Sequence, residues 1–472
     1  MFLGHYLAID PVWAWSAYEP DPKSPWTIEK AGHLYRRAAW GANWTELQTA
    51  LKQGPRASID QLLTGGTGLE AFHQKAARLA EPLAQGTDDQ RLRAWWLYVI
   101  LNSPHPLEER LTLLWHNHFA TSNAKVQNIG SMYRQNELLR RHALGNFDKL
   151  LHDVSEDSAM LVWLDTVANK KGKPNENYAR ELMELFSLGV GNYNETDIRQ
   201  AARAFTGWGI KSDRYHFNPD EHDDGQKTVM GKTSTFGGHD IVKLCLDHPA
   251  CARFVVRKLF RYFISETLQP DDALIEPLAA RFRENHYDIK QLVSIILRSN
   301  LFFSPEVYRA KVKAPVEFAV TLVHMLEGRV DSIQLADLLD PLGQRLFAPP
   351  SVKGWDGGPN WLNSTTMLLR HNLCLALTST EDRRFYNRCD PAQLTRKHMN
   401  VADPTLDQTT QFLADLFLQG DIPTTTHSKF VARCTQLKQQ KYAAYWSQDF
   451  IKDYQTRAIA HLILTLPEFQ LA

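Results

Sequence analysis

The predicted helix at residues 176–189 (ENYARELMELFSLG) contains three glutamates, of which Glu181 and Glu184 are candidates for a base or a metal ligand. Its apolar residues recur at helical spacing, and Gly189 is a typical stop signal. On a helical wheel, Glu181 falls between leucines of the apolar face, and Glu184 lies just outside that face. A carboxylate that points inward must be ion-paired, hydrogen-bonded, metal-bound or protonated, because burying it bare is costly. Two interpretations stay open: a catalytic or metal-binding carboxylate, and a structural ion pair with an arginine such as Arg203.

The predicted helix at residues 108–122 (EERLTLLWHNHFATS) contains two histidines. His118 continues a stripe of leucines and is expected to face inward, whereas His116 lies about 200° away around the helix. A straight helix cannot aim both rings at one metal ion, because paired ligands on a helix are three or four residues apart. The alternatives are a helix that ends near residue 116, two histidines with different roles, or core histidines with one hydrogen bond each.

Two irregular loops carry further candidate residues. The segment EHDDG (221–225) groups His222 with Asp223. Carboxylate and imidazole ligands of this kind bind divalent cations, and a solvated turn is the alternative. The segment KGWDGGPNW (353–361) contains Trp355 and Trp361, which are expected either to stack on a sugar or another flat ligand, or to fill the core. The first of these interpretations requires both rings to be exposed on one surface.

These residues lead to one hypothesis of an enzyme and one of a non-catalytic protein. In the enzyme, helix 108–122, helix 176–189 and loop 216–227 form one pocket, where a glutamate is the base, a histidine is its partner and an arginine holds an anion. The predicted catalytic residues are Glu181, Glu184, His118, Arg180 and Arg203; the predicted ligands of a divalent metal are His116, His118, Glu181, His222 and Asp223; and the predicted ligand-binding residues are Asn177, Lys227, Trp355 and Trp361. In the alternative, a scaffold or partner-binding protein, the same polar residues form a buried hydrogen-bond network that fixes the helices.

The elements that position these residues are predicted to be helical. Asn194 is expected to cap a helix, with Asp197 three residues further on as its reciprocal partner. We expect an all-α, multi-helix orthogonal assembly with a small β-hairpin insert near residues 209–240, where turn-rich sequence surrounds the alternating pieces YHF and KTVM. The chain is predicted to divide into an N-terminal extended arm (1–26), a main helical domain (27–380) and a C-terminal helical segment (381–472) that packs on it.

Composition narrows the class of protein. Lys and Arg total 53 and Asp and Glu total 53, so the net charge is zero and no broad basic surface for nucleic acid is expected. No apolar run is long enough to span a membrane, and the N-terminus lacks the features of a secretory signal, so a cytoplasmic location is expected. The 5 cysteines include no CxxC pair and are expected to be free thiols. Phosphate-loop, dinucleotide-binding, HExxH and GxSxG signatures are absent, which disfavours the corresponding enzyme classes.

Five segments together resemble an uncharacterised bacterial family. They are KAGHLYRRAAWG (30–41), LTLLWHNHFATSNAKV (111–126), PNENYARELMELFSLGVGNYNETDIRQAARAFTGW (174–208), HDDGQKTVMG (222–231) and LFAPPSVKGWDGGPNWLNS (346–364). In this order they are similar to the family known as domain of unknown function 1800, over residues 27 to 380.

The resemblance implies an α-helical bacterial protein of a family without a settled activity. Members are often exported, and their genes often lie beside that of a second uncharacterised family similar to sulfatases or phosphatases. This implies extracellular polymer or sulfated-glycan metabolism, an anionic or glycan-type polymer as substrate, and the neighbouring gene's product as partner. The present chain departs from the family by lacking an export signal. The polar residues that match the family motifs are His116, His118, Asn175, Glu176, Asn177, Arg180, Glu181, Glu184, Arg203, His222, Asp223 and Lys227.

Overall fold

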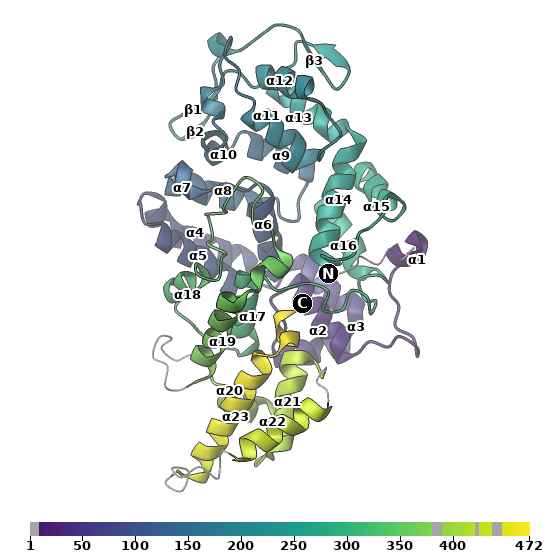
Figure 1. Cartoon of the computed structure of the whole chain (residues 1–472), viewed down its shortest axis with the longest axis vertical. Coiled ribbons are helices and arrows are strands. Elements are labelled where there is room, and N and C mark those ends of the chain that lie inside the picture. Colours follow the sequence, from purple (N-terminus) through teal and green to yellow (C-terminus); the bar gives the residue numbers. More distant parts are fainter. Residues whose placement is uncertain (1–8, 380–388, 421–423, 437–445) are drawn as a thin grey trace.

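Helices form nearly all of the regular structure in this computed structural model, which describes residues 9–379, 389–420, 424–436 and 446–472. Figure 1 shows an elongated molecule with helices α9 to α13 and the strands at one end, and helices α20 to α23 at the other. The strands of the described residues form two antiparallel two-stranded sheets. The predicted all-α assembly with a small hairpin insert is therefore confirmed, and the insert contains two hairpins instead of one.

The first part of the chain contains the elements that carry most of the motifs. In order they are α1 (Pro11–Trp15), α2 (Ile28–Ala38), α3 (Trp44–Thr64), α4 (Leu69–Ala84), α5 (Asp89–Asn102), α6 (Pro106–His118), α7 (Asn123–Val126), α8 (Ile129–Arg141), α9 (Phe147–Ser155), α10 (Ser158–Trp163), α11 (Asn177–Glu181) and α12 (Glu195–Ala204), then the hairpins β1 (Trp208–Lys211) with β2 (Arg214–Phe217) and β3 (Lys227–Val229) with β4 (Lys232–Ser234). The predicted extended arm thus contains a short helix, α1, because Pro11 is suited to its first position and Asp10 caps it.

The second part of the chain returns along the long axis. Its elements are α13 (Gly238–Asp247), α14 (Pro249–Phe263), α15 (Asp272–Glu284), α16 (Ile289–Arg298), α17 (Pro315–Met325), α18 (Ser332–Leu339), α19 (Ser364–Thr378), α20 (Pro391–His398), α21 (Leu406–Leu418), α22 (Thr424–Gln436) and α23 (Gln448–Leu464). Residues 469–472 then run back to the middle of the molecule (Figure 1), where Leu471 forms a β-bridge with Val312 and the N–H of Ala472 donates to the carbonyl of Lys311 at 2.8 Å.

Two hydrophobic cores meet at helix α6. Leu111 and Leu114 belong to a core built mainly from α2, α3, α6 and α9 to α16. Leu113 belongs to a second core, built mainly from α5, α17 to α19, α21 and α23. Helix α6 is therefore buried on more than one face, and neighbouring residues of this helix pack into different cores.

The predicted helix 176–189 changes its winding part-way. After α11, residues Leu182–Ser187 form a π-helix, in which the N–H of Leu188 donates to the carbonyl of Met183 at 2.9 Å, five residues back. A π-turn contains more residues than an α-turn, so a wheel drawn for an α-helix rotates these side chains too far. Glu181, the last residue of α11, and Glu184, within the π-helix, are both half-buried.

Candidate functional site

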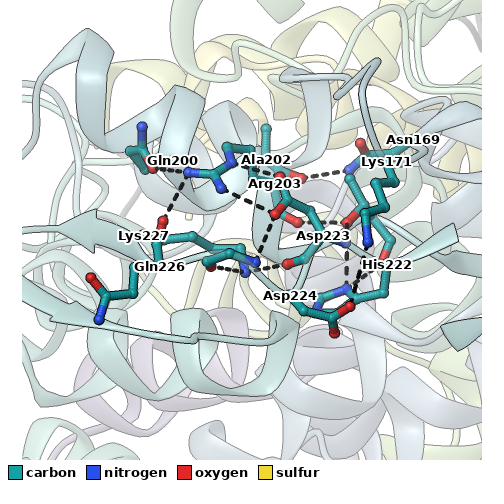
Figure 2. Close-up of polar contacts among 12 residues, drawn as sticks. Asn169, Lys171, Gln200, Ala202, Arg203, His222, Asp223, Asp224, Gln226 and Lys227 are labelled. Atoms are coloured by element: carbon teal, nitrogen blue, oxygen red, sulfur yellow. Dashed lines mark hydrogen bonds and ion pairs between the residues drawn. The ribbon is translucent and has the colours of Figure 1, made fainter. Parts of the chain in front are cut away.

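Arg203 of α12 is the centre of a group of polar contacts, which we call the Arg203 clamp (Arg203, Thr206, His222, Asp223 and Lys227). Figure 2 shows Arg203 with His222, Asp223 and Lys227. Its Nε and Nη2 donate to the two carboxylate oxygens of Asp223 at 2.7 and 3.0 Å. Its Nη1 donates to Oε1 of Gln200 at 2.7 Å and to the carbonyl of Gln226 at 3.0 Å. The hydrogen bonds from Arg203 lower the pKa of Asp223 to about 2, so this pair is ionised at neutral pH.

The other clamp residues bind the backbone of the same loop. The ring of His222 contacts the carbonyl of Thr206 through Nδ1 at 2.8 Å, and the N–H of Asp223 donates to the Thr206 hydroxyl at 2.8 Å. Lys227 is buried, and its ammonium donates to the carbonyls of Asp223 and of Gly225. Burial lowers the pKa of Lys227. The structure therefore brings four predicted residues together as a self-contained loop support.

The glutamates of helix 176–189 do not contact the clamp. Burial raises the pKa of Glu181, and the negative charge of Glu184 raises it further. Oε2 of Glu184 accepts a hydrogen bond from the Tyr193 hydroxyl at 3.1 Å. The proposed structural pair of either glutamate with Arg203 is wrong, because the guanidinium of Arg203 already binds Asp223.

The remaining polar residues of α11 bind side chains at the surface of the protein around this helix. Arg180 donates to both carboxylate oxygens of Glu195 at 2.8 Å and to Glu176 at 3.2 Å. The side-chain amide of Asn177 donates to Asp165 at 3.3 Å. The guanidinium of Arg180 is thus already paired with two carboxylates of this chain, instead of being unpaired and open to an anionic ligand.

The two histidines of α6 face different cores, as their spacing predicts. His116 is buried among the rings of Trp96, Phe347 and Trp355, and its Nε2 accepts the backbone N–H of Phe347 at 3.2 Å. Burial lowers the pKa of His116 to about 3, so the ring is neutral. His118 is buried in the other core, where its Nε2 contacts the carbonyl of Phe186 at 3.1 Å. The helix ends at His118, short of the predicted end at residue 122, and includes both histidines.

The two loop tryptophans are inside the protein. Trp355 is 7% exposed and Trp361 is 9% exposed. Binding of a sugar by both rings on one surface is therefore wrong. The physical reason is visible at Gly354, whose positive φ lets the loop press on α6: the N–H of Trp355 donates to Oδ1 of Asn117 at 2.7 Å, and a Cβ on Gly354 would lie 2.1 Å from that oxygen.

The predicted metal ligands are divided among separate surroundings. His222 and Asp223 belong to the clamp, Glu181 lies beside Glu184, and each α6 histidine lies in its own core. Within the part of the chain that the structure describes, no three His, Cys, Asp or Glu side chains form a ligand group. Binding of a divalent metal stays a prediction.

The family is decided by a match over nearly the whole chain. The family described as "Protein of unknown function (DUF1800)" matches residues 33–471. The chain belongs to this family. The match includes the C-terminal helices beyond residue 380, which the sequence motifs do not cover. The searches of curated proteins and of solved structures found no match. Among the described residues, no helix has the length and apolar character needed to cross a membrane.

One residue that sequence reasoning missed in this family member is Lys258 of α14. It is half-buried, and burial followed by the charge of Arg261 lowers its pKa to about 8. Its charge also contributes to the low pKa of His118, whose Nδ1 is buried without a hydrogen-bond partner. The sequence did contain a signal for this residue. Lys258 follows Phe254 by four residues and Val255 by three, which places it on the apolar face of an amphipathic helix.

A second group that was missed lies in the interior and is dominated by cations. Its members are Arg37, Arg110, Lys311, Lys313, Arg370 and Glu317, which we call the Glu317 cluster. They are spread over the sequence from residue 37 to residue 370, so no local spacing predicts their association.

Proposed function

We propose that this chain is a non-catalytic, partner-binding protein whose polar motif residues support the fold. The observation that carries the proposal is the Arg203 clamp, where all three guanidinium nitrogens of Arg203 bind acceptors of the same chain. A buried or half-buried polar group that is fully satisfied inside the protein rigidifies its surroundings. The clamp attaches the loop between the two hairpins to α12.

A further contact supports this structural role. One oxygen of Asp197 completes the capping box of α12 with the N–H of Asn194 at 3.0 Å. The other oxygen accepts the N–H of Met230 at 2.7 Å and thereby fixes the second hairpin on the same helix. The motif residues of this region thus position a small, rigid insert at one end of the molecule.

The opposite end of the molecule offers the surface for a partner. Leu375 of α19 is 50% exposed, and Phe450 and Tyr454 of α23 are 48% and 40% exposed. Leu375 and Tyr454 border a hollow of about 300 Å³ between α19, α22 and α23. Grouped exposed apolar side chains beside a hollow are typical of a protein–protein contact.

The test uses the product of the neighbouring sulfatase- or phosphatase-like gene, which the family resemblance suggests as partner. Both purified proteins are mixed and analysed by size-exclusion chromatography with light scattering and by calorimetry. We expect a complex that Leu375→Ser weakens about tenfold or more, since burying one leucine at a contact is worth about 1.5 kcal/mol or more and about 1.4 kcal/mol corresponds to tenfold. Leu79→Ser is the matched control, because Leu79 is 46% exposed on α4, away from this hollow. No complex, or equal weakening by both substitutions, contradicts the proposal.

The second candidate function is catalysis beside Lys258, on an anionic or glycan-type polymer. A lysine whose pKa is about 8 is neutral in part at physiological pH and is able to act as a base or nucleophile. Glu181, whose pKa is raised by burial, is the last residue of α11, and the π-helix that follows it packs against α14. Competitive acetylation of the folded protein, read by peptide mass spectrometry, is expected to give Lys258 a midpoint near pH 8. A midpoint at the ordinary lysine value, 10.5, removes the basis of this candidate.

A further inference from the structure

The Glu317 cluster concentrates positive charge where water is excluded. Arg37 of α2, Arg110 of α6 and Arg370 of α19 are each 0% exposed, Lys313 is 1% exposed and Lys311 is 6% exposed. The carboxylate of Glu317 in α17, at 2% exposure, is placed among them. The cluster therefore contains five cationic side chains and one carboxylate, all buried.

Glu317 neutralises only one part of this group. Its Oε1 accepts a hydrogen bond from Nη2 of Arg110 at 2.6 Å, and its Oε2 accepts one from Nζ of Lys311 at 3.2 Å. These two cations lower the pKa of Glu317 to about 2, although burial alone would raise it. Glu266, half-buried nearby, accepts the backbone N–H of Val312 at 3.3 Å and adds one further negative charge at the edge.

The other three cations contact only neutral acceptors. Lys313 donates to the carbonyl of Phe469 at 2.7 Å, and Nη2 of Arg37 donates to the carbonyl of Val307 at 2.9 Å. Arg370 donates to the carbonyl of Lys313 at 2.8 Å and to the side-chain oxygen of Gln470 at 3.2 Å. Carbonyl groups satisfy hydrogen-bond donors without cancelling a full charge.

Several donors in the same region have no acceptor at all. Nε and Nη1 of Arg37, Nε of Arg110 and Nε of Arg370 are buried without a hydrogen-bond partner. The indole N–H of Trp40 is also buried without a hydrogen-bond partner. The ring of this tryptophan lies against the guanidinium of Arg110, with 5.1 Å between the guanidinium carbon and the ring centre. Every one of these unmatched groups is a donor, so the region lacks acceptors as well as negative charge.

We infer that the Glu317 cluster binds a small inorganic oxyanion, of the phosphate or sulfate class, in the interior of the folded protein. A buried net charge is strongly unfavourable unless it is paired, and arginine does not lose its proton readily. An oxyanion supplies negative charge and several acceptor oxygens together, and guanidinium groups bind such oxygens well. This inference concerns the stability of the interior and does not depend on the proposed partner-binding function.

The protonation behaviour of the cations agrees with an unmet need for negative charge. Burial lowers the pKa of Lys311 and of Lys313, and for Lys313 the charge of Arg36 lowers it further. Burial also lowers the pKa of Arg37 to about 9 and that of Arg370 to about 10. A bound dianion would reverse these shifts.

The direct experiment measures the anion that the protein carries. Protein purified without phosphate or sulfate in the final buffers is desalted and denatured, and the released anions are quantified by ion chromatography. We expect about one equivalent of phosphate or sulfate per chain, and a loss of most of it in Arg37→Met. Arg93→Met is the matched control, since Arg93 is also buried but is paired with Asp340 at 2.9 Å, and it should retain the anion.

A second measurement covers the case where Arg37→Met fails to fold. Thermal unfolding of the unaltered protein is followed at increasing phosphate and at increasing sulfate, with sodium chloride holding the ionic strength constant. We expect the transition to rise with oxyanion concentration, by the equivalent of about 2.7 kcal/mol at one hundred times the dissociation constant. The more effective anion identifies the natural ligand. Protein without bound oxyanion and with no oxyanion-dependent shift, or a shift by chloride alone, overturns the inference.

Discussion

The Arg203 clamp and the Glu317 cluster are built from the same residue types, but they balance charge differently. In the clamp, Arg203 and Asp223 are 27% and 21% exposed, and one carboxylate serves one guanidinium in two parallel hydrogen bonds. In the cluster, one carboxylate serves two cations directly, and three more cations lie nearby in full burial. The charges of the clamp are therefore balanced within the chain, whereas the cluster requires a compensating negative charge or the loss of protons.

The largest effect is expected from Glu317→Gln. This change leaves Arg110 and Lys311 without their carboxylate in the buried cluster, so we expect a loss of about 3–5 kcal/mol in the free energy of unfolding. Urea unfolding followed by circular dichroism measures it. A loss below about 1 kcal/mol would show that the cluster is neutral without Glu317 and would remove the contrast with the clamp.

The next largest effect is expected in the pH dependence of stability, which the lysines of the Glu317 cluster should cause. The pKa values of Lys311 and Lys313 are lowered from 10.5 in the folded state, so the unfolded state binds more protons over the range from the lowered values up to 10.5. Stability should therefore rise with pH through that range, by up to about 1.4 kcal/mol per pH unit for each lysine. Urea midpoints in buffers free of oxyanions test this slope. Lys313→Met should reduce it, and saturating phosphate should flatten it; a slope that survives both changes has another origin.

A smaller and more local effect is expected in the clamp. Arg203→Met removes the two hydrogen bonds to Asp223 at a half-exposed site, so we expect a loss of about 1–3 kcal/mol. Hydrogen exchange should increase in β1 to β4 and remain unchanged around Glu317. Increased exchange throughout the molecule would mean that the clamp is coupled to the interior and is not a local support.

The smallest effect is expected at the surface of α11. Arg180→Gln removes the contacts with Glu195 and Glu176, whose side chains are 67% and 38% exposed. Exposed ion pairs contribute below about 1 kcal/mol, so the thermal transition should change little and the remaining difference should vanish in high salt. A loss comparable to that of Arg203→Met would mean that exposure does not explain the contrast between clamp and surface.

Local patterns in the sequence predicted the features that depend on neighbouring residues. The capping box of Asn194 and Asp197 is confirmed, because both partners lie within one helical turn. The opposite directions of His116 and His118 follow from the helical repeat, and their two cores confirm them. The piece YHF lies in β2 and most of KTVM lies in β3, although one hairpin was predicted there and the structure has two.

Features that depend on distant residues were not predictable in this way. The π-helix at Leu182–Ser187, which contains Glu184, was not predicted, because nothing in an apolar repeat distinguishes it from an α-helix. The burial of Trp355 depends on Asn117, far away in the sequence. The Glu317 cluster joins Arg37 to Arg370, and only the folded topology brings such residues together.

The return of residues 469–472 to the middle of the molecule has a consequence for biosynthesis. The carbonyl of Phe469 binds the ammonium of Lys313, the carbonyl of Gln470 binds the backbone N–H of Lys313, and Ala472 binds the backbone of Lys311. While the ribosome still holds these residues, water must solvate the lysines that they later cover. These two lysines therefore stay in contact with water until residues 469–472 have left the ribosome and packed against them.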